Sequence, residues 1–99
     1  MRESEVESYL AKKVKQIGGL APKWVSPGQR GVPDRIVILH NGITLYVEVK
    51  APGKKLAPLQ ELWAKRLTKL GHRAYMIDTK EGVDSFIGEC QQMIQEVVQ

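Results

Sequence analysis

Cysteine and histidine are scarce in this sequence, and their scarcity limits the kinds of site that the chain can build. Cys90 is the single cysteine among 99 residues, and His40 and His72 are the two histidines. One cysteine cannot form an intramolecular disulfide, and structural zinc sites draw on four Cys or His ligands. A disulfide framework is therefore excluded, and a structural zinc site is not expected.

The sequence also lacks a long apolar run. No uninterrupted hydrophobic stretch approaches the roughly 18–20 residues that span a bilayer, so we expect no membrane segment. The first residues are polar and charged and do not resemble a secretory signal, which favours the cytoplasm as the location. A length of 99 residues suits one compact domain, and we expect a single domain over residues 1–99.

Acidic residues are the minority among the charges. The 15 Lys and Arg residues outnumber the 11 Asp and Glu residues, which leaves a net charge of +4 and a pI of about 9.3. The N-terminal half carries much of this positive charge, at Lys12, Lys13, Lys15, Lys23, Arg30, Arg35, Lys50, Lys54 and Lys55. Such a basic half favours a polyanionic partner such as nucleic acid, while a lysine-rich surface that contacts only solvent remains the alternative.

Hydrophobic periodicity predicts three helices and four short strands. The helices cover residues 4–17, 59–70 and 83–98, and the strands cover residues 20–25, 36–39, 44–50 and 73–78. Residues 36–39 are apolar throughout, which is typical of a strand that is buried on both faces. The order α-β-β-β-α-β-α predicts an α/β fold in which helices flank a small mixed sheet.

A hairpin is predicted to gather three charged side chains. The sequence Asn-Gly at positions 41 and 42 is a strong signal for a tight turn between two antiparallel strands. Glu48 and Lys50 are two residues apart in the second of these strands, so their side chains share a face. Asp34 opens the first strand, and counting outward from the turn brings it to the same end of the hairpin as Glu48. Two carboxylates and one ammonium group are thus expected on one patch.

This combination of groups suits phosphodiester hydrolysis. Carboxylate oxygens are the ligands that Mg²⁺ prefers, and a bound cation neutralises charge on the phosphate. The ammonium group of Lys50 can orient the attacking water and stabilise the developing negative charge. The usual pKa of lysine is about 10.4, so Lys50 acts as a general base only if that pKa is strongly lowered. A cross-strand ion pair between Asp34 and Lys50 is the structural alternative.

Two further groups can reach the patch. Glu3 and Glu7 stand one turn apart on the first helix, and either can bind a metal ion directly or through water. Gln60 lies at the start of the second helix, where its amide can hydrogen-bond the attacking water, Lys50 or a phosphate oxygen. Alone, Gln60 is also compatible with an ordinary surface position, and the nuclease interpretation depends on the whole set in this order.

The order of these residues resembles a known family. Pro33-Asp34 followed by Glu48-Val49-Lys50 resembles the signature of the PD-(D/E)xK nuclease superfamily, whose fold is the restriction-endonuclease-like core. A helical Glu, then Gly-x-Pro-Asp, Glu-x-Lys and a helical Gln resemble, more narrowly, the virus-type replication-repair nuclease (VRR-NUC) family and its small stand-alone phage members. The resemblance extends from Glu3 to about Asp78.

The resemblance implies a metal-dependent DNA endonuclease, similar to Holliday-junction resolvases, that acts as a homodimer on branched DNA. It implies that the cation is Mg²⁺ or Mn²⁺, with one or two ions equally open, and that a phage protein of this kind works in the cytoplasm of a bacterial host. The implied catalytic residues are Glu7, Asp34, Glu48, Lys50 and Gln60. The implied metal ligands are Asp34, Glu48, the Val49 backbone carbonyl and, through water, Glu7, with Glu3 as the alternative helical carboxylate.

Exposed cations are expected to contact DNA phosphates without reading the base sequence. The candidates are Lys12, Lys15, Lys23, Arg30, Lys54 and Lys55. Trp24 and Trp63 are expected to serve as packing residues rather than as base-stacking platforms. Two other functions stay open, namely a DNA-binding module that does not cleave and a subunit of a larger phage replication or packaging assembly.

Overall fold

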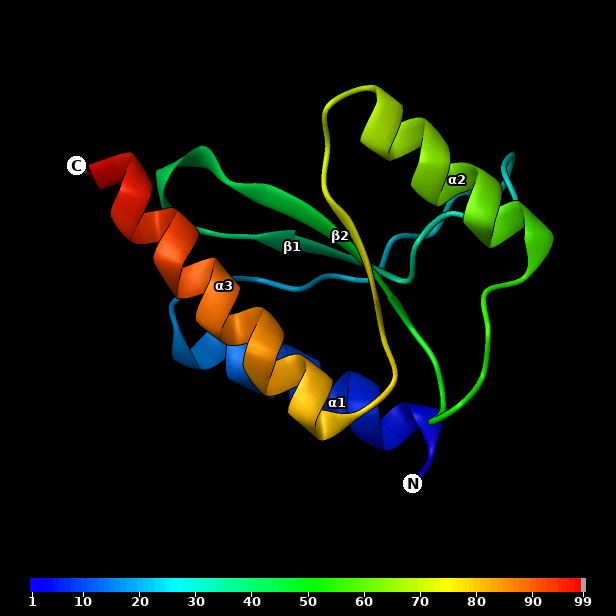
Figure 1. Cartoon of the computed structure of the whole chain (residues 1–99), viewed down its shortest axis with the longest axis horizontal. Coiled ribbons are helices and arrows are strands. Elements are labelled where there is room, and N and C mark those ends of the chain that lie inside the picture. The colour runs from blue at the N-terminus through cyan, green and yellow to red at the C-terminus, as the bar shows by residue number, and fades with distance from the viewer. Residues whose placement is uncertain (99) are drawn as a thin grey trace.

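The computed structural model describes residues 1–98 and shows a mixed sheet with helices on both of its faces (Figure 1). The sheet has the strand order β1-β2-β3, in which β1 pairs antiparallel with β2, and β2 pairs parallel with β3. The elements in chain order are α1 (Glu3–Gln16), β1 (Arg35–Ile38), the short 3₁₀ helix η1 (His40–Gly42), β2 (Thr44–Val49), α2 (Pro58–Lys69), β3 (Ala74–Ile77) and α3 (Lys80–Val98). The predicted α/β class with a small mixed sheet is confirmed.

The main core lies between one face of the sheet and the helices α1 and α3. Side chains alternate along β2, so Leu45, Val47 and Val49 point to this face and are buried. α1 and α3 pack against each other and bury apolar residues at helical spacing, among them Leu10 and Phe86. No helix in residues 1–98 is long and apolar enough to cross a membrane.

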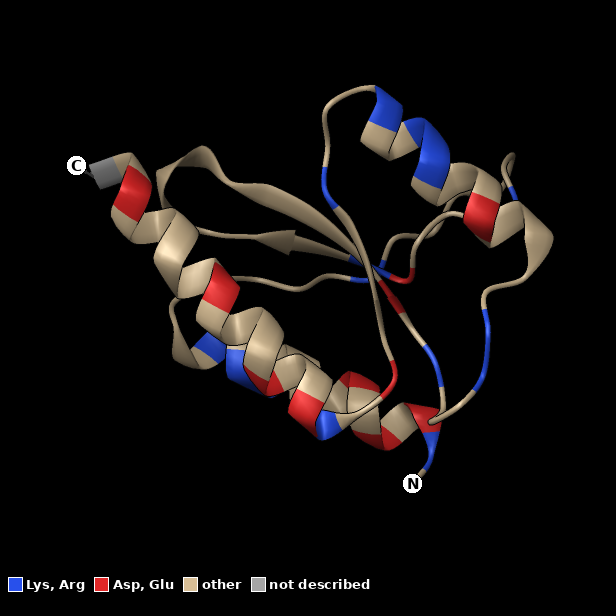
Figure 2. Ribbon diagram, viewed as in Figure 1, with Lys and Arg blue, Asp and Glu red and all other residues tan. Residues whose placement is uncertain are grey.

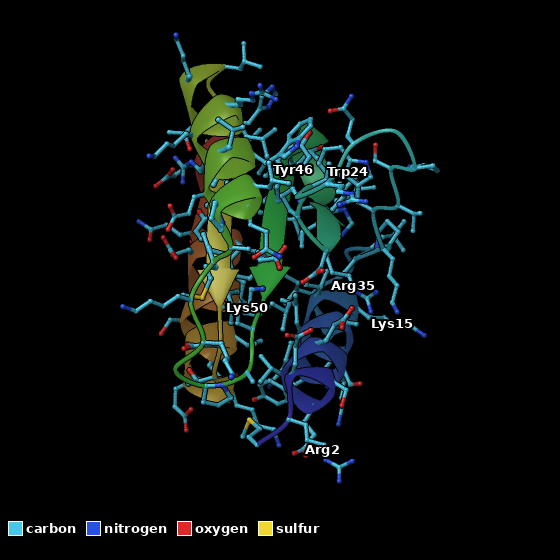
Figure 3. The ribbon with its side chains drawn as sticks, turned by 90° about the vertical axis from the view of Figure 1, so that its right-hand side faces the viewer. Arg2, Lys15, Trp24, Arg35, Tyr46 and Lys50 are labelled. Carbon is cyan, nitrogen blue, oxygen red and sulfur yellow. The ribbon has the colours of Figure 1, made fainter. Side chains whose placement is uncertain are left out.

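The opposite face of the sheet carries α2 and a smaller aromatic cluster. Tyr46 points to this face and lies 5.5 Å from the ring of Trp24, which in turn lies 5.8 Å from Trp63 of α2 in an edge-on arrangement. Figure 3 shows Trp24 beside Tyr46, with Lys50 just beyond the end of the same strand. The half-buried tryptophans therefore pack α2 and the segment before β1 onto the sheet.

The predicted strand at residues 20–25 is wrong, because this segment forms two isolated bridges rather than a strand. Leu20 pairs with Ile38, and Lys23 pairs with Arg35. Between them, the Pro22 carbonyl accepts a hydrogen bond from the amide of Ile36, but proline has no amide hydrogen to return. The ladder is therefore interrupted, and the sheet in the described part of the chain has three strands instead of four.

The prediction that residues 36–39 are buried on both faces is also wrong. Ile38 is 41% exposed, whereas Val37 beside it is fully buried. The reason is that α2 contacts β3, at the other edge of the sheet, and leaves the outer face of β1 partly open.

The other predicted elements agree with the structure to within a few residues. Asn41 and Gly42 form the predicted turn with φ angles of +65° and +75°, values that asparagine and glycine tolerate best. α3 begins at Lys80, three residues before the predicted start, because Thr79 caps it. The Thr79 hydroxyl accepts a hydrogen bond from the amide of Gly82 at 2.9 Å, which satisfies an otherwise unpaired helical N–H.

Candidate active site

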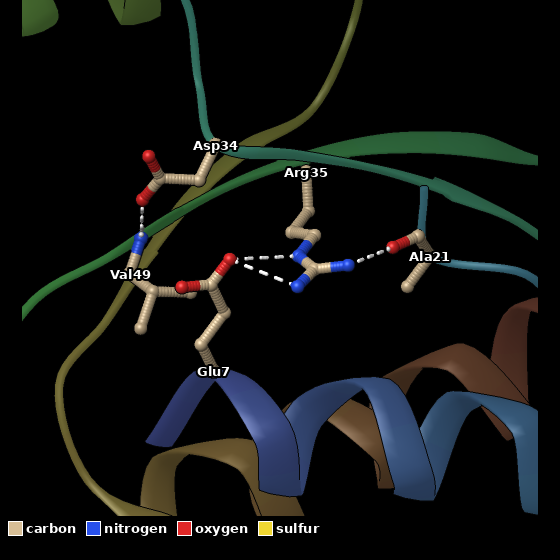
Figure 4. A network of polar contacts seen from close by, with 5 residues as sticks. All are labelled: Glu7, Ala21, Asp34, Arg35 and Val49. Atoms are coloured by element: carbon tan, nitrogen blue, oxygen red, sulfur yellow. Dashed lines mark hydrogen bonds and ion pairs between the residues drawn. The ribbon is translucent and has the colours of Figure 1, made fainter. Parts of the chain in front are cut away.

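The β1–β2 hairpin brings Asp34 and Glu48 to the same end of the sheet. Arg35 pairs with Val47, so the next residues outward, Asp34 and Glu48, face each other across the two strands. The Asp34 carboxylate accepts a hydrogen bond from the backbone amide of Val49 at 2.8 Å (Figure 4). This bond holds Asp34 against β2 and leaves its second carboxylate oxygen available.

Glu48 is the buried charged residue of the site. Its side chain is buried, and its Oε2 atom accepts a hydrogen bond from Gln60 Nε2 at 2.7 Å and lies 3.4 Å from Lys50 Nζ. The Oε1 atom is also buried, yet it has no hydrogen-bond partner among the described residues. A buried carboxylate oxygen without a partner costs free energy, and a cation at this position removes that cost.

The surroundings of Glu48 raise its pKa from the usual 4.5 to about 7. Burial is the largest cause, and the nearby negative charge of Asp34 acts in the same direction. The ammonium group of Lys50 opposes both effects by favouring the charged carboxylate. A cation placed beside Glu48 would favour its charged form and offset the effects of burial and of Asp34.

Gln60 orients the Glu48 carboxylate. The backbone amide of Ala57 donates a hydrogen bond to Gln60 Oε1 at 2.8 Å, which fixes the direction of the side-chain amide. Gln60 Nε2 then points at Glu48. The sequence predicted Gln60 beside the water, Lys50 or a phosphate, and the structure instead places it on the carboxylate.

Glu7 is occupied by a partner that the sequence analysis did not anticipate. Arg35 contacts Glu7 Oε1 through Nη2 at 2.9 Å and through Nε at 3.0 Å, and its Nη1 donates to the carbonyl of Ala21 at 2.7 Å (Figure 4). The guanidinium thus ties α1 and the 20–24 segment to β1. The position of Arg35 at the start of an apolar strand could have predicted an ion pair, because a buried charged group needs a counter-charge.

Glu7 does not complete a three-carboxylate ligand group with Asp34 and Glu48, and a role for Glu7 through water stays a prediction. Within residues 1–98, no three His, Cys, Asp or Glu side chains are arranged so that they could share one metal ion. The alternative helical carboxylate, Glu3, is exposed. The two carboxylates at the hairpin end, with the unpartnered oxygen of Glu48, nevertheless fit the oxygen chemistry of a hard divalent cation.

The candidate DNA-binding cations are exposed and come from several segments. Lys12 and Lys15 lie on α1, Lys23 and Arg30 lie in the segments before β1, and Lys54 and Lys55 lie between β2 and α2. Figure 2 shows positive charge on the chain that leaves β2 and on α2, whereas α3 carries several acidic residues. The cations of α2, Lys65, Arg66 and Lys69, are a basic group that the sequence analysis did not single out.

A hairpin that ends in two carboxylates and a lysine, set in a mixed sheet with flanking helices, defines the class of PD-(D/E)xK nuclease domains. The VRR-NUC domain family model matches residues 4–81, and the chain belongs to this family.

Individual relatives agree with the family assignment. The chain is 48% identical over 81 residues to “Putative nuclease p44” of Acyrthosiphon pisum secondary endosymbiont phage 1, covering 82% of this chain and 87% of that protein. It is also similar to a solved VRR-NUC domain, with a TM-score of 0.82 and 31% identity, over 87% of this chain and 94% of the other. The chain is therefore a nuclease domain by family, fold and relatives.

Proposed function

We propose that this chain is a divalent-metal-dependent DNA endonuclease whose site is built on Asp34, Glu48 and Lys50. The observation that carries the proposal is the burial and hydrogen bonding of the two Glu48 carboxylate oxygens. One of its oxygens is held by Gln60 and lies near Lys50, whereas the other is buried without a partner beside a second carboxylate. A structural ion pair would satisfy both oxygens, so this arrangement favours a site prepared for a cation.

Asp34 and Glu48 would hold Mg²⁺ or Mn²⁺, with the backbone carbonyl of Val49 as a further ligand. When bound, the cation supplies activation of water and neutralisation of charge on the scissile phosphate. Lys50 Nζ, which lies 3.4 Å from Glu48 Oε2, orients the attacking water and stabilises the developing negative charge. Gln60 fixes the rotation of the Glu48 carboxylate, so that Oε1 faces the cation. Glu7 holds Arg35 through Oε1 and is left out of the direct ligands, so any contact of Glu7 with the cation would pass through water.

The proposed substrate is branched DNA, with a four-way junction as the leading candidate. The support is membership of the VRR-NUC family, together with exposed cations on α1, in the segment before β1 and between β2 and α2. A two-fold symmetric junction is matched by a two-fold symmetric enzyme, so we propose a homodimer that nicks the junction symmetrically. The phage relative supports an origin in a phage genome and action in the cytoplasm of its bacterial host.

The test is cleavage of a labelled four-way junction beside a linear duplex of matched sequence. Each substrate is incubated with Mg²⁺, with Mn²⁺ and with EDTA, using the wild type, Asp34→Ala and Lys50→Ala. Metal-dependent cleavage that is faster on the junction and lost in both variants supports the proposal. If the wild type bound the junction but cleaved nothing with either metal ion, the endonuclease proposal would fail and the non-catalytic DNA-binding module would take its place.

Oligomeric state is measured separately, by light scattering on the protein alone and with the junction. A monomer in both conditions that cleaves the junction would contradict the homodimer while leaving the nuclease proposal in place.

A further inference from the structure

Gly31 lies in an unusually close contact with the first turn of α2. Its φ angle is +86°, in the region that favours glycine. A Cβ atom added at Gly31 would lie 2.6 Å from both the carbonyl carbon and the carbonyl oxygen of Leu59, and 2.8 Å from its Cβ atom. Non-bonded atoms do not pack at such distances, so the loop before β1 can touch α2 here only because residue 31 has no side chain.

This contact is one residue away from the group that orients Glu48. Leu59 directly precedes Gln60, whose Nε2 atom donates to Glu48 Oε2 at 2.7 Å. Gly31, Gln60 and Glu48 also line the same small cavity between the loop, α2 and the sheet. The position of the Leu59 backbone therefore sets how far the Gln60 amide reaches toward the carboxylate.

A side chain at position 31 has to push the Leu59 backbone away. Ordinary contact begins at about 3.4 Å, so the loop and the first turn of α2 would have to separate, and we expect α2 to take up part of this shift. A hydrogen bond of 2.7 Å tolerates little lengthening before it weakens. The Glu48 carboxylate would then lose its oriented donor and could rotate.

We infer that Gly31 is a positioning residue of the active site, which holds the first turn of α2 where Gln60 orients Glu48. The effect on catalysis rests on the proposed nuclease function, whereas the effect on Gln60 does not. Gly31 acts through Gln60 and contacts neither DNA nor metal in this role.

The first measurement uses metal-free wild-type protein and needs no activity. Nuclear Overhauser effects are expected between the Gly31 Hα protons and Leu59, and their absence would overturn the contact. The resonances of the Gln60 side-chain amide are then compared in wild type, Gly31→Ala and Gly71→Ala. Gly71 is the matched control, since its φ is +91° but, apart from its chain neighbours, no atom of the described residues lies within 4 Å of an added Cβ. The inference predicts that the Gln60 amide shifts toward solvent-exposed values in Gly31→Ala and stays unchanged in Gly71→Ala.

Cleavage kinetics supply the second measurement. Misplacement of a catalytic group by about 1 Å can cost about 100-fold in rate, so kcat is expected to fall by that order in Gly31→Ala with KM little changed. In a Gln60→Ala background, Gly31→Ala should cause no further loss, because its effect passes through Gln60. The inference would be overturned if the two substitutions reduced kcat independently, so that their effects multiplied in the double variant. It would also be overturned if the resonances of the Gln60 amide did not change in Gly31→Ala. If the wild type cleaved no DNA, the proposed function would be wrong, but the comparison of Gln60 amide resonances would still test the role of Gly31.

Discussion

Arg35 binds Glu7 through two nitrogens on one carboxylate oxygen, at 2.9 Å and 3.0 Å, and both side chains are largely buried. The pair joins the first helix to the first strand one residue after Asp34. Because the guanidinium neutralises Glu7, this carboxylate has a structural partner that a free metal ligand would lack. The pair lies next to Asp34 and holds α1 against this end of β1.

Glu7→Gln should lower the stability of the protein and leave metal binding nearly intact. The substitution removes a charge partner of Arg35, and hydrogen bonds to charged groups contribute about 1.5–3 kcal/mol. Urea unfolding measures the loss, and calorimetry with Mn²⁺ measures the binding. Glu5→Gln is the control, because Glu5 is exposed on the same helix. If Glu7→Gln lost Mn²⁺ binding as fully as Asp34→Asn, Glu7 would have to be a ligand.

Asp34→Asn should separate activity from stability. The asparagine carbonyl can still accept the hydrogen bond from the Val49 amide, so the hairpin end keeps its geometry. Loss of the negative charge beside Glu48 relieves repulsion, and the metal-free variant is expected to be at least as stable as the wild type. Cleavage should fall by more than about 100-fold because a cation ligand is missing. A variant that is clearly destabilised in EDTA would show that Asp34 has a structural role.

The metal-free protein should lose stability as the pH rises. The pKa of Glu48 is about 7 in the folded state, against 4.5 ordinarily, so the folded state holds this proton more tightly than the unfolded state. That contribution is fully present below about pH 4.5 and is lost as the pH rises through 7, in total on the order of 3 kcal/mol. Urea unfolding in EDTA between pH 5 and pH 8 measures it. Glu48→Gln should flatten this dependence, and an equally steep slope in the variant would assign it to another group.

Cys90 should stay unreactive until the protein unfolds. Its side chain is fully buried in the core, and burial, with a smaller effect of Glu89, raises the pKa of the thiol to about 12. Thiolate is the reactive form, and both its fraction and its access are therefore small in the native state. Release of thionitrobenzoate from Ellman's reagent should be slow in native protein and rapid in denaturant. Rapid reaction of the native protein would mean that the helix α3 opens readily from the core.

The local features of this chain were predictable because they depend on neighbouring residues. Side-chain alternation in β2 and the Asn41-Gly42 turn are enough to place Asp34 opposite Glu48, and the register confirms that geometry. One failure has a local cause that the sequence contains: Pro22 has no amide hydrogen and interrupts the ladder with β1. The other depends on a distant element, because Ile38 is exposed where α2 contacts β3 instead of β1.

The sequence by itself determined the hairpin, its carboxylates and its lysine, since strand period and turn chemistry act over a few residues. Tertiary structure decided which partner each charged group received. Whether Glu7 meets a metal site or Arg35 depends on how α1 packs on the sheet. Whether Glu48 is buried, with one oxygen held by Gln60 and the other unpartnered, depends on α2 and its contact with Gly31. These contacts join residues far apart in the chain, and their geometry follows from packing, which no local pattern encodes.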